Sequence, residues 1–395
     1  MKFIVANDNG NSEHKLAVNG QTYHQPNVYA LYNNRPSEDL KTLDIVMDEL
    51  LDNIVVTIDS KAISSNARTY VIGSRALEIA SGNALQNMNI KRSKKHEEIL
   101  PIVNTLGYLS ALATKRQFES NGTLKEGETI ELNVTMTTAL PATAHDENTS
   151  NQFREKFTEH YHEVKVHYNN SHATVKIKFD EVKVLVEGVP ALFNIIEDGN
   201  GGYRDDDIFD EFKKEYKKNK IDGSYFSDKR LLHVDIGDGT TELTFTKGYK
   251  NDKGKSFGED FGLGIALEDA LSTFKKEMEA YDLKVKRQDL SAYLRNRNSD
   301  FYDLAVACIQ EPLEQLAERL FNSISDRASE LKLGFDVIVI YGGASIILKE
   351  TLQPLLIEKY SPIKKEILWI PEKYATDMNM EGMQIYNDIT YSEKV

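Results

Sequence analysis

Two kinds of apolar pattern alternate along the chain. Short apolar runs are typical of buried strands, as at Phe3–Ala6 and Phe335–Tyr341, and Glu131–Met136 alternates apolar and polar residues as a strand does. Longer segments repeat apolar residues every three or four positions, and residues 97–119 predict an amphipathic helix in this way. Strands and helices that alternate along one chain predict an α/β protein.

The same patterns predict the other elements. Further strands are expected at Glu13–Val18, Gln21–Tyr23, Asn53–Ile58, Thr69–Ile72, Glu163–His167, Thr174–Phe179, Val182–Val186, Glu242–Thr246 and Ile367–Ile370. Further helices are expected at 40–51, 74–80, 151–160, 190–196, 263–280, 287–296, 301–332, 346–359 and 380–388. Residues 25–90 are less regular, and we interpret them as an insertion on the first domain.

Two turns of the same composition follow predicted strands. Asp8–Ser12 comes after the first strand, and Asp235–Thr241 comes after the run that ends at Val234. The dipeptide Asn19-Gly20 is typical of a hairpin, so the first turn joins two strands. A P-loop or dinucleotide-binding turn would open a helix instead.

The composition of these turns predicts phosphate binding. Glycines let backbone N–H groups approach phosphate oxygens, and hydroxyl, amide and ammonium side chains add further donors. A carboxylate at 4 Å from a phosphate charge costs roughly 4 kcal/mol at an effective dielectric of about 20, so Asp8 and Asp235 indicate Mg²⁺ between them, held largely through water. The expected phosphate ligands are Asp8, Gly10, Asn11, Ser12 and Lys15, and Asp235, Gly237, Asp238, Gly239, Thr240 and Thr241.

Two further segments complete the candidate site. Gly342, Gly343, Ala344 and Ser345 follow a buried strand, where glycines would let an adenosine lie against the backbone. The alternative for that segment is an ordinary tight turn between a strand and a helix. Glu187 ends a strand and could orient or deprotonate a water molecule; its alternative role is electrostatic, at a helix N-terminus.

Length and charge limit the function classes. At 395 residues the chain exceeds the roughly 250–300 residues that one core supports, so we expect two domains. The loop Gly199–Gly202 is our candidate for the crossing into the second domain. A net charge of −14 disfavours direct binding to nucleic acid or anionic membranes, and one cysteine excludes an internal disulfide framework. We expect a cytosolic protein that would reach DNA only through a partner.

Three other motifs have ordinary interpretations. The basic run Lys91–Lys95 predicts a solvated face, with a protein contact as the alternative. Asp205–Asp207 predict the acidic start of a helix rather than a metal site. Gly248–Ser256 resembles a P-loop but has the wrong glycine spacing, so we interpret it as a hairpin loop.

Together the motifs resemble the actin, heat-shock chaperone and sugar-kinase ATPase superfamily. Asp8–Lys15 is similar to its first phosphate motif, Asp235–Thr241 to its second and Tyr341–Ala344 to its adenosine motif. Val182–Ala191 resembles the first connecting segment, and Ser325–Leu333 stands where the second belongs.

Within the superfamily, the chain is most similar to the plasmid-segregating bacterial actins, the ParM-like group. Leu140–Thr143, Glu187 and Gly262–Ile265 carry this likeness. Asn7 departs from it, because an apolar residue or an acid usually precedes the first aspartate. The resemblance implies a duplicated ribonuclease-H-like fold of two domains with a nucleotide cleft between them. Domain I would be residues 1–190 with about 371–395, and domain II residues 191–370.

The resemblance also implies a function. The leading hypothesis is an ATPase of the bacterial cytosol that binds ATP (or GTP) and Mg²⁺ and polymerises with itself. It would move plasmid DNA through a DNA-binding adaptor on the plasmid centromere, with Glu187, Asp8 and Asp235 serving hydrolysis and no membrane involved. The alternatives are a small-molecule kinase of the same fold, for a sugar or an acetate-type substrate, and a cytoskeletal actin without a role in segregation.

Overall fold

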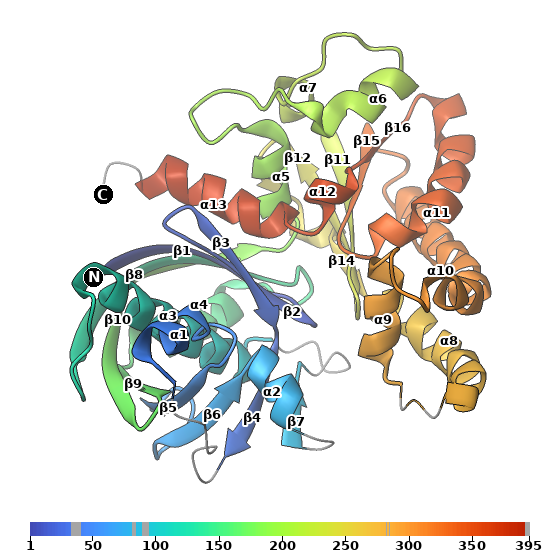
Figure 1. Cartoon of the computed structure of the whole chain (residues 1–395). Helices are drawn as coiled ribbons and strands as arrows, with labels where there is room; N and C mark the ends of the chain where they lie inside the picture. Colours follow the sequence, from blue (N-terminus) through green and yellow to red (C-terminus); the bar gives the residue numbers. More distant parts are fainter. Residues whose placement is uncertain (33–40, 81–83, 89–94, 282, 284, 392–395) are drawn as a thin grey trace. The chain divides into compact units, whose positions relative to one another are not determined.

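The computed structural model describes residues 1–32, 41–80, 84–88, 95–281, 283 and 285–391. The chain forms two compact units, Met1–Pro190 with Asn379–Val395, and Ala191–Met378 (Figure 1). It therefore crosses between the units after Pro190 and again after Met378. The loop Gly199–Gly202, which we expected to hold the first crossing, lies inside the second unit. Ser325–Leu333, the segment likened to the second connecting segment, contains the end of helix α10 (Tyr302–Glu330) and also lies inside that unit.

One mixed sheet organises the described part of the first unit. Its strand order is β3-β2-β1-β8-β10-β9-β5-β6-β4-β7. The bounds are β1 Lys2–Asn9, β2 Glu13–Val18, β3 Gln21–Pro26, β4 Val28–Tyr32, β5 Val55–Ser60, β6 Arg68–Ile72, β7 Leu85–Asn87, β8 Thr129–Leu140, β9 His162–Tyr168 and β10 Ser171–Val186. Strands β4 to β7 thus extend the sheet by antiparallel pairing beyond β9.

Helices cover both faces of this sheet. The long helix α3 (Leu100–Asn121) packs its buried side chains against Phe3, Val5 and the neighbouring strands, together with α1 (Leu43–Asp48) and α4 (Glu147–Thr158). On the other face, α13 (Met378–Tyr391) places Met380 and Met383 over alanines of β1, β2 and β8. The short helix α2 (Ser74–Ile79) covers the outer strands β4–β6.

The second unit is a smaller sheet between two helical layers. Its strands run in the order β13-β12-β11-β15-β16, with β14 also paired to β12. The bounds are β11 Arg230–Ile236, β12 Thr241–Lys247, β13 Lys250–Asn251, β14 Phe257–Glu259, β15 Val337–Tyr341 and β16 Glu366–Trp369. Residues of β15 alternate between the two layers, because successive side chains of a strand point to opposite faces.

The two layers have different helices. One contains α8 (Leu263–Met278), α9 (Arg287–Arg295), α10 and α11 (Ser345–Tyr360). The other contains α5 (Val189–Ile196), α6 (Asp210–Glu215), α7 (Ser224–Ser227) and α12 (Glu372–Ala375). Among the described residues, no helix has the length and apolarity needed to span a membrane.

The two sheets repeat one arrangement. In the first unit β1 pairs with β2 antiparallel and with β8 parallel, and β8 pairs with β10 parallel. In the second unit β11 pairs in the same senses with β12 and β15, and β15 pairs with β16 parallel. This repetition agrees with the predicted duplication.

Two local predictions have clear outcomes. The strands expected at Thr174–Phe179 and Val182–Val186 are one strand, β10, with an irregularity in its pairing between Phe179 and Glu181. The polar pair Asp180-Glu181 at this irregularity interrupts the apolar alternation, which is why the sequence suggested a break. The P-loop-like segment Gly248–Ser256 forms no P-loop, because it lies beside β12 in a hairpin-like loop that includes β13.

Candidate nucleotide-binding site

The first acid–glycine turn joins β1 and β2. Asp8 is opposite Lys15 in the antiparallel ladder, and the Gly10 N–H donates to the Glu13 carbonyl at 2.9 Å. A Cβ on Gly10 would lie 2.9 Å from that carbonyl oxygen, so the tight turn requires glycine. The Lys15 side chain is only 12% exposed, and its Nζ lies 3.8 Å from a carboxylate oxygen of Glu13.

The second turn repeats this geometry between β11 and β12. The Gly237 N–H donates to the Thr240 carbonyl at 2.9 Å, and a Cβ on Gly237 would lie 3.0 Å from the same oxygen. Asp235 precedes Gly237 by the same spacing as Asp8 precedes Gly10. Both aspartates are half-buried, and each is the penultimate residue of its strand, β1 or β11. The two turns are therefore duplicated in hydrogen bonding as well as in sequence.

Hydrogen bonds from Asn27, between β3 and β4, hold the first turn. The Asn27 N–H donates to the Ser12 carbonyl at 2.9 Å, and Asn27 Nδ2 donates to the Gly10 carbonyl at 2.6 Å. Asn104 of α3 donates in turn to Asn27 Oδ1 at 2.7 Å. These bonds engage carbonyl oxygens of the turn, which would repel a phosphate if they faced it.

A buried polar network lies on the opposite face of β1 from Asp8. Asn7 and Asn9, which flank Asp8, are both buried, and Asn9 Nδ2 donates to Asn7 Oδ1 at 3.0 Å. His14 Nε2 lies 2.6 Å from that same oxygen, and Asn7 Nδ2 donates to Thr105 of α3. Burial, with a smaller contribution from the positive charge of Lys95, lowers the pKa of His14 to about 3. A neutral histidine can therefore donate from Nε2, which explains the polar residue at Asn7.

Glycine contacts hold the second turn instead. Backbone N–H groups of Leu263 and Gly264 donate to the carbonyls of Gly237 and Asp238 at 3.1 and 2.7 Å. A Cβ on Gly262 would lie 2.4 Å from the Gly237 oxygen, which explains why the segment before α8 carries glycine.

Two side chains support the same loop. Arg287 Nη2 donates to a carboxylate oxygen of Asp238 at 3.1 Å. The buried hydroxyl of Thr241 donates to the Phe261 carbonyl at 2.9 Å.

The glycines of the adenosine segment lie against the second turn. Gly342 has a φ of +93°, and its Cβ would lie 2.5 Å from Asp235 Oδ1 and 2.4 Å from the Ile236 carbonyl oxygen. The Ala344 N–H donates to that Ile236 carbonyl at 3.0 Å, and the Ser345 hydroxyl donates to the Gly342 carbonyl at 2.8 Å. Gly343 is exposed. The second unit thus brings together Asp235–Thr241, Gly262–Gly264 and Gly342–Ser345.

Glu187 lies in the first unit with Asp8. It follows β10, and its backbone N–H donates to the Leu140 carbonyl at 2.9 Å. Its side chain is 17% exposed, and Lys95 Nζ donates to Glu187 Oε1 at 2.9 Å. Burial raises the pKa of Glu187, the Lys95 charge opposes that rise and the Asp8 charge adds to it. The charges of Lys95 and Asp8 therefore act on the pKa of Glu187 in opposite directions.

Lys95 is the site neighbour that sequence reasoning missed. Residues 91–94 of the basic run lie outside the described residues, but Lys95 is 6% exposed. The prediction of a solvated face is wrong for Lys95, because its ammonium group pairs with Glu187 inside the unit. Charge composition gave no signal for this, since the partner lies far along the chain.

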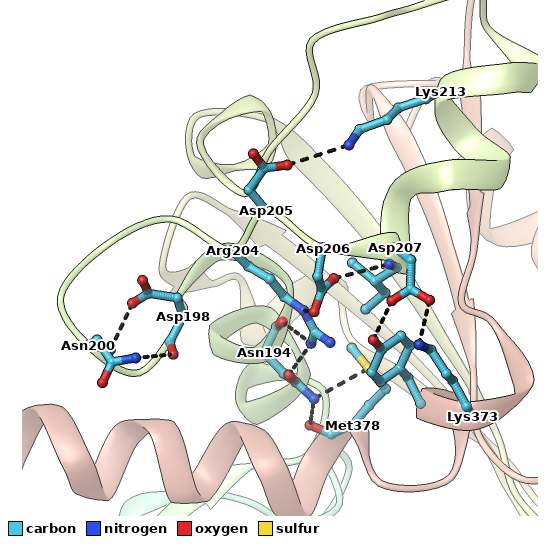
Figure 2. Close-up of polar contacts among 12 residues, drawn as sticks. Asn194, Asp198, Asn200, Arg204, Asp205, Asp206, Asp207, Lys213, Lys373 and Met378 are labelled. Carbon is cyan, nitrogen blue, oxygen red and sulfur yellow. Dashed lines mark hydrogen bonds and ion pairs between the residues drawn. The ribbon is translucent and has the colours of Figure 1, made fainter.

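The three consecutive aspartates, Asp205–Asp207, contact three different cations. Figure 2 shows their carboxylates pointing to different partners, and Asp206 also caps the following turn by accepting the Ile208 N–H at 3.0 Å. The cations that they contact are Lys213 for Asp205, Arg204 for Asp206 and Lys373 for Asp207. Nowhere in the described part of the chain do three His, Cys, Asp or Glu side chains cluster to hold a metal ion.

Comparison with known proteins identifies the fold. No protein-family model and no curated protein matches the chain, but solved structures do. Actin-like protein Alp7A matches with a TM-score of 0.70 and 16% identity, over 100% of this chain and 98% of that one. Bacillus thuringiensis ParM with ATP matches with a TM-score of 0.64 and 13% identity, over 99% of both chains. An archaeal actin homolog matches with a TM-score of 0.60 and 14% identity, over 100% of both chains. The chain has an actin-like fold, as the sequence motifs predicted.

The contact between Gly342 and Asp235 generates a test. We expect Gly342→Ala to lower the free energy of unfolding by at least about 2 kcal/mol, because alanine is strained at positive φ and its Cβ would overlap the Asp235 carboxylate. Gly343→Ala is the matched control, since its Cβ would meet nothing nearer than 3.8 Å. Urea unfolding of both variants measures the difference. Equal stability would show that the close packing at Gly342 is not required.

Proposed function

We propose that the chain is an actin-like ATPase that binds ATP with Mg²⁺, assembles head to tail into filaments and hydrolyses the bound ATP. The observation that carries this proposal is the repetition of one Asp–Gly turn, with the same hydrogen bond, in both units of an actin-like fold. The matching Bacillus thuringiensis ParM structures are described with ATP and with ADP, which supports a nucleotide as the ligand.

The proposed nucleotide contacts are divided between the units. In the first unit Gly10, Asn11, Ser12 and Lys15 would bind phosphate oxygens through N–H, amide, hydroxyl and ammonium groups. In the second unit Gly237–Thr241 would do the same, and Gly342–Ser345 would contact the adenosine. One nucleotide would be bound by both turns. GTP offers the same phosphates, so the base preference is left to measurement.

The residues present fit a hydrated magnesium ion. Each turn supplies one half-buried carboxylate, Asp8 or Asp235, and Mg²⁺ prefers oxygen ligands and retains several waters. Two carboxylates alone would not hold the ion, so phosphate and water oxygens would complete its shell. When bound, Mg²⁺ supplies the positive charge that offsets repulsion between the carboxylates and the triphosphate.

Glu187 would act on the attacking water. Its carboxylate accepts a hydrogen bond from the water and orients it toward the γ-phosphorus. A new phosphorus–oxygen bond forms, the bond to the β–γ bridging oxygen breaks, and the water proton passes to Glu187 or to a phosphate oxygen. The raised pKa of Glu187 brings its basicity closer to that needed at neutral pH.

Filament formation and its use follow from the same resemblance. A head-to-tail interface joins two different surfaces of the protein and can repeat without closing, which produces a filament. The net charge of −14 disfavours direct contact with DNA, so a DNA-binding adaptor on a plasmid would link filament and cargo in the bacterial cytoplasm.

Sedimentation with nucleotide tests the proposed function. We expect the chain to pellet with ATP and Mg²⁺ at concentrations well above micromolar, and phosphate release to follow assembly. ADP, or ATP with a chelator, should leave it in the supernatant, because the γ-phosphate and the cation would both be needed.

No pellet with either ATP or GTP would contradict a filament-forming function. Phosphate transfer to an added sugar or to acetate, without assembly, would favour a small-molecule kinase of the same fold instead.

Removing the Glu187 carboxylate tests the hydrolytic step. Glu187→Gln keeps the size of the side chain and an oxygen for Lys95, so we expect ATP affinity within about threefold of the parent chain. Hydrolysis should slow by roughly 100-fold or more, as is usual when a general base is lost. Filaments of Glu187→Gln should therefore outlast filaments of the parent chain, which disassemble once their ATP is hydrolysed. The exposed Glu131 of β8 provides the control, and Glu131→Gln should behave as the parent. Unchanged turnover in Glu187→Gln would remove Glu187 from the reaction.

A further inference from the structure

Lys95 is a buried cation in the short segment that leads into α3. Its side chain is 6% exposed, and a lysine ammonium group that loses its water must gain compensating interactions. The structure supplies one, the 2.9 Å hydrogen bond from Lys95 Nζ to Glu187 Oε1. The two residues are distant in sequence, so the pair exists only because the first unit folds.

The contact with Lys95 fixes the orientation of the Glu187 side chain, which the backbone alone does not determine. The Glu187 N–H continues the pairing of β10 with β8 through the Leu140 carbonyl, which fixes the position of its Cα. A glutamate side chain has several rotamers about its own bonds, and the Lys95 contact selects among them. Selection of this kind matters for a carboxylate that must place a water molecule accurately.

The positive charge of Lys95 also affects other ionisable groups of the first unit. Its field lowers the pKa of His14, which belongs to the network behind Asp8. It also opposes the rise in the pKa of Glu187 that burial and Asp8 produce. The charge of Lys95 therefore acts on His14 as well as on Glu187, whose negative charge it offsets directly through the 2.9 Å contact.

We propose that Lys95 is a positioning residue for hydrolysis, whose ammonium group holds the Glu187 carboxylate ionised and in the orientation that receives the attacking water. This inference rests on the proposed function, because it assigns Lys95 a role through Glu187. A different role, direct contact with a phosphate, would show itself in nucleotide binding. A role in folding alone would leave turnover unchanged in a folded variant.

The experiment compares four variants by steady-state ATP hydrolysis and thermal unfolding: Lys95→Met, Lys95→Arg, Glu187→Gln and the double variant Lys95→Met with Glu187→Gln. We expect Lys95→Met to lower kcat at least tenfold, with KM within about twofold, because the oriented carboxylate is lost but the nucleotide contacts remain. Lys95→Arg should keep at least about a third of kcat, since it retains the charge. The double variant should be no slower than Glu187→Gln, because both changes remove one function.

Thermal unfolding gives a readout that does not depend on activity. Lys95→Met removes the ammonium partner of the Glu187 carboxylate, so its melting temperature should fall by about 5 °C or more. The double variant removes that charge and should recover at least half of the loss. The exposed pair of Lys41 with Glu49 is the matched control, and Lys41→Met should change the melting temperature by less than about 2 °C.

Several results would overturn the inference. Lys95→Met with the parent kcat would do so, as would a raised KM at unchanged kcat or a double variant much slower than Glu187→Gln. If Lys95→Met does not fold, failure of Lys95→Arg to retain turnover, or of the double variant to recover stability, would also overturn it. Slow turnover in Glu187→Gln together with parent-like turnover in Lys95→Met would reject the role of Lys95 but not that of Glu187. Parent-like turnover in Glu187→Gln would reject the role of Glu187 and this inference together.

Discussion

Repulsion between carboxylates and phosphates is the constraint on which the proposed site depends. Asp8 and Asp235 stand at corresponding places in two turns whose glycines are suited to close approach by phosphate oxygens. A carboxylate and a phosphate a few ångströms apart repel each other by several kcal/mol, unless a cation lies between the two charges. The turns therefore suit a nucleotide that arrives with magnesium, and they must be held rigidly so that the carboxylates do not swing away.

The two units hold their turns by different means. The first unit uses buried polar side chains, with Asn7, Asn9 and a neutral His14 behind Asp8. The second unit uses close backbone contacts, in which Gly262 and Gly342 approach the turn more tightly than any side chain would allow. The two units thus share their strand pairing and turn geometry but differ in the interactions that support the turns.

Short-range patterns made much of the fold and site predictable. Apolar runs followed by Asp-x-Gly turns located both turns, and Asn19-Gly20 located the hairpin, because these signals depend on neighbouring residues. The pairing of Lys95 with Glu187, and of Asn104 with Asn27, depends on elements that only the folded sheet brings together. For the same reason, β10 was predicted as two strands, and Gly199–Gly202 was expected to hold a crossing that occurs after Pro190.

Titration calorimetry of ATP in Mg²⁺, at concentrations below those that assemble, tests most directly whether one nucleotide uses both turns. The parent chain should bind one ATP per molecule. Asp8→Asn and Asp235→Asn should each lower the affinity at least tenfold in Mg²⁺, and the double variant should lose less than the product of the two, because the aspartates would serve one ion. Two ATP molecules per chain, or either single variant with the parent affinity, would contradict the account.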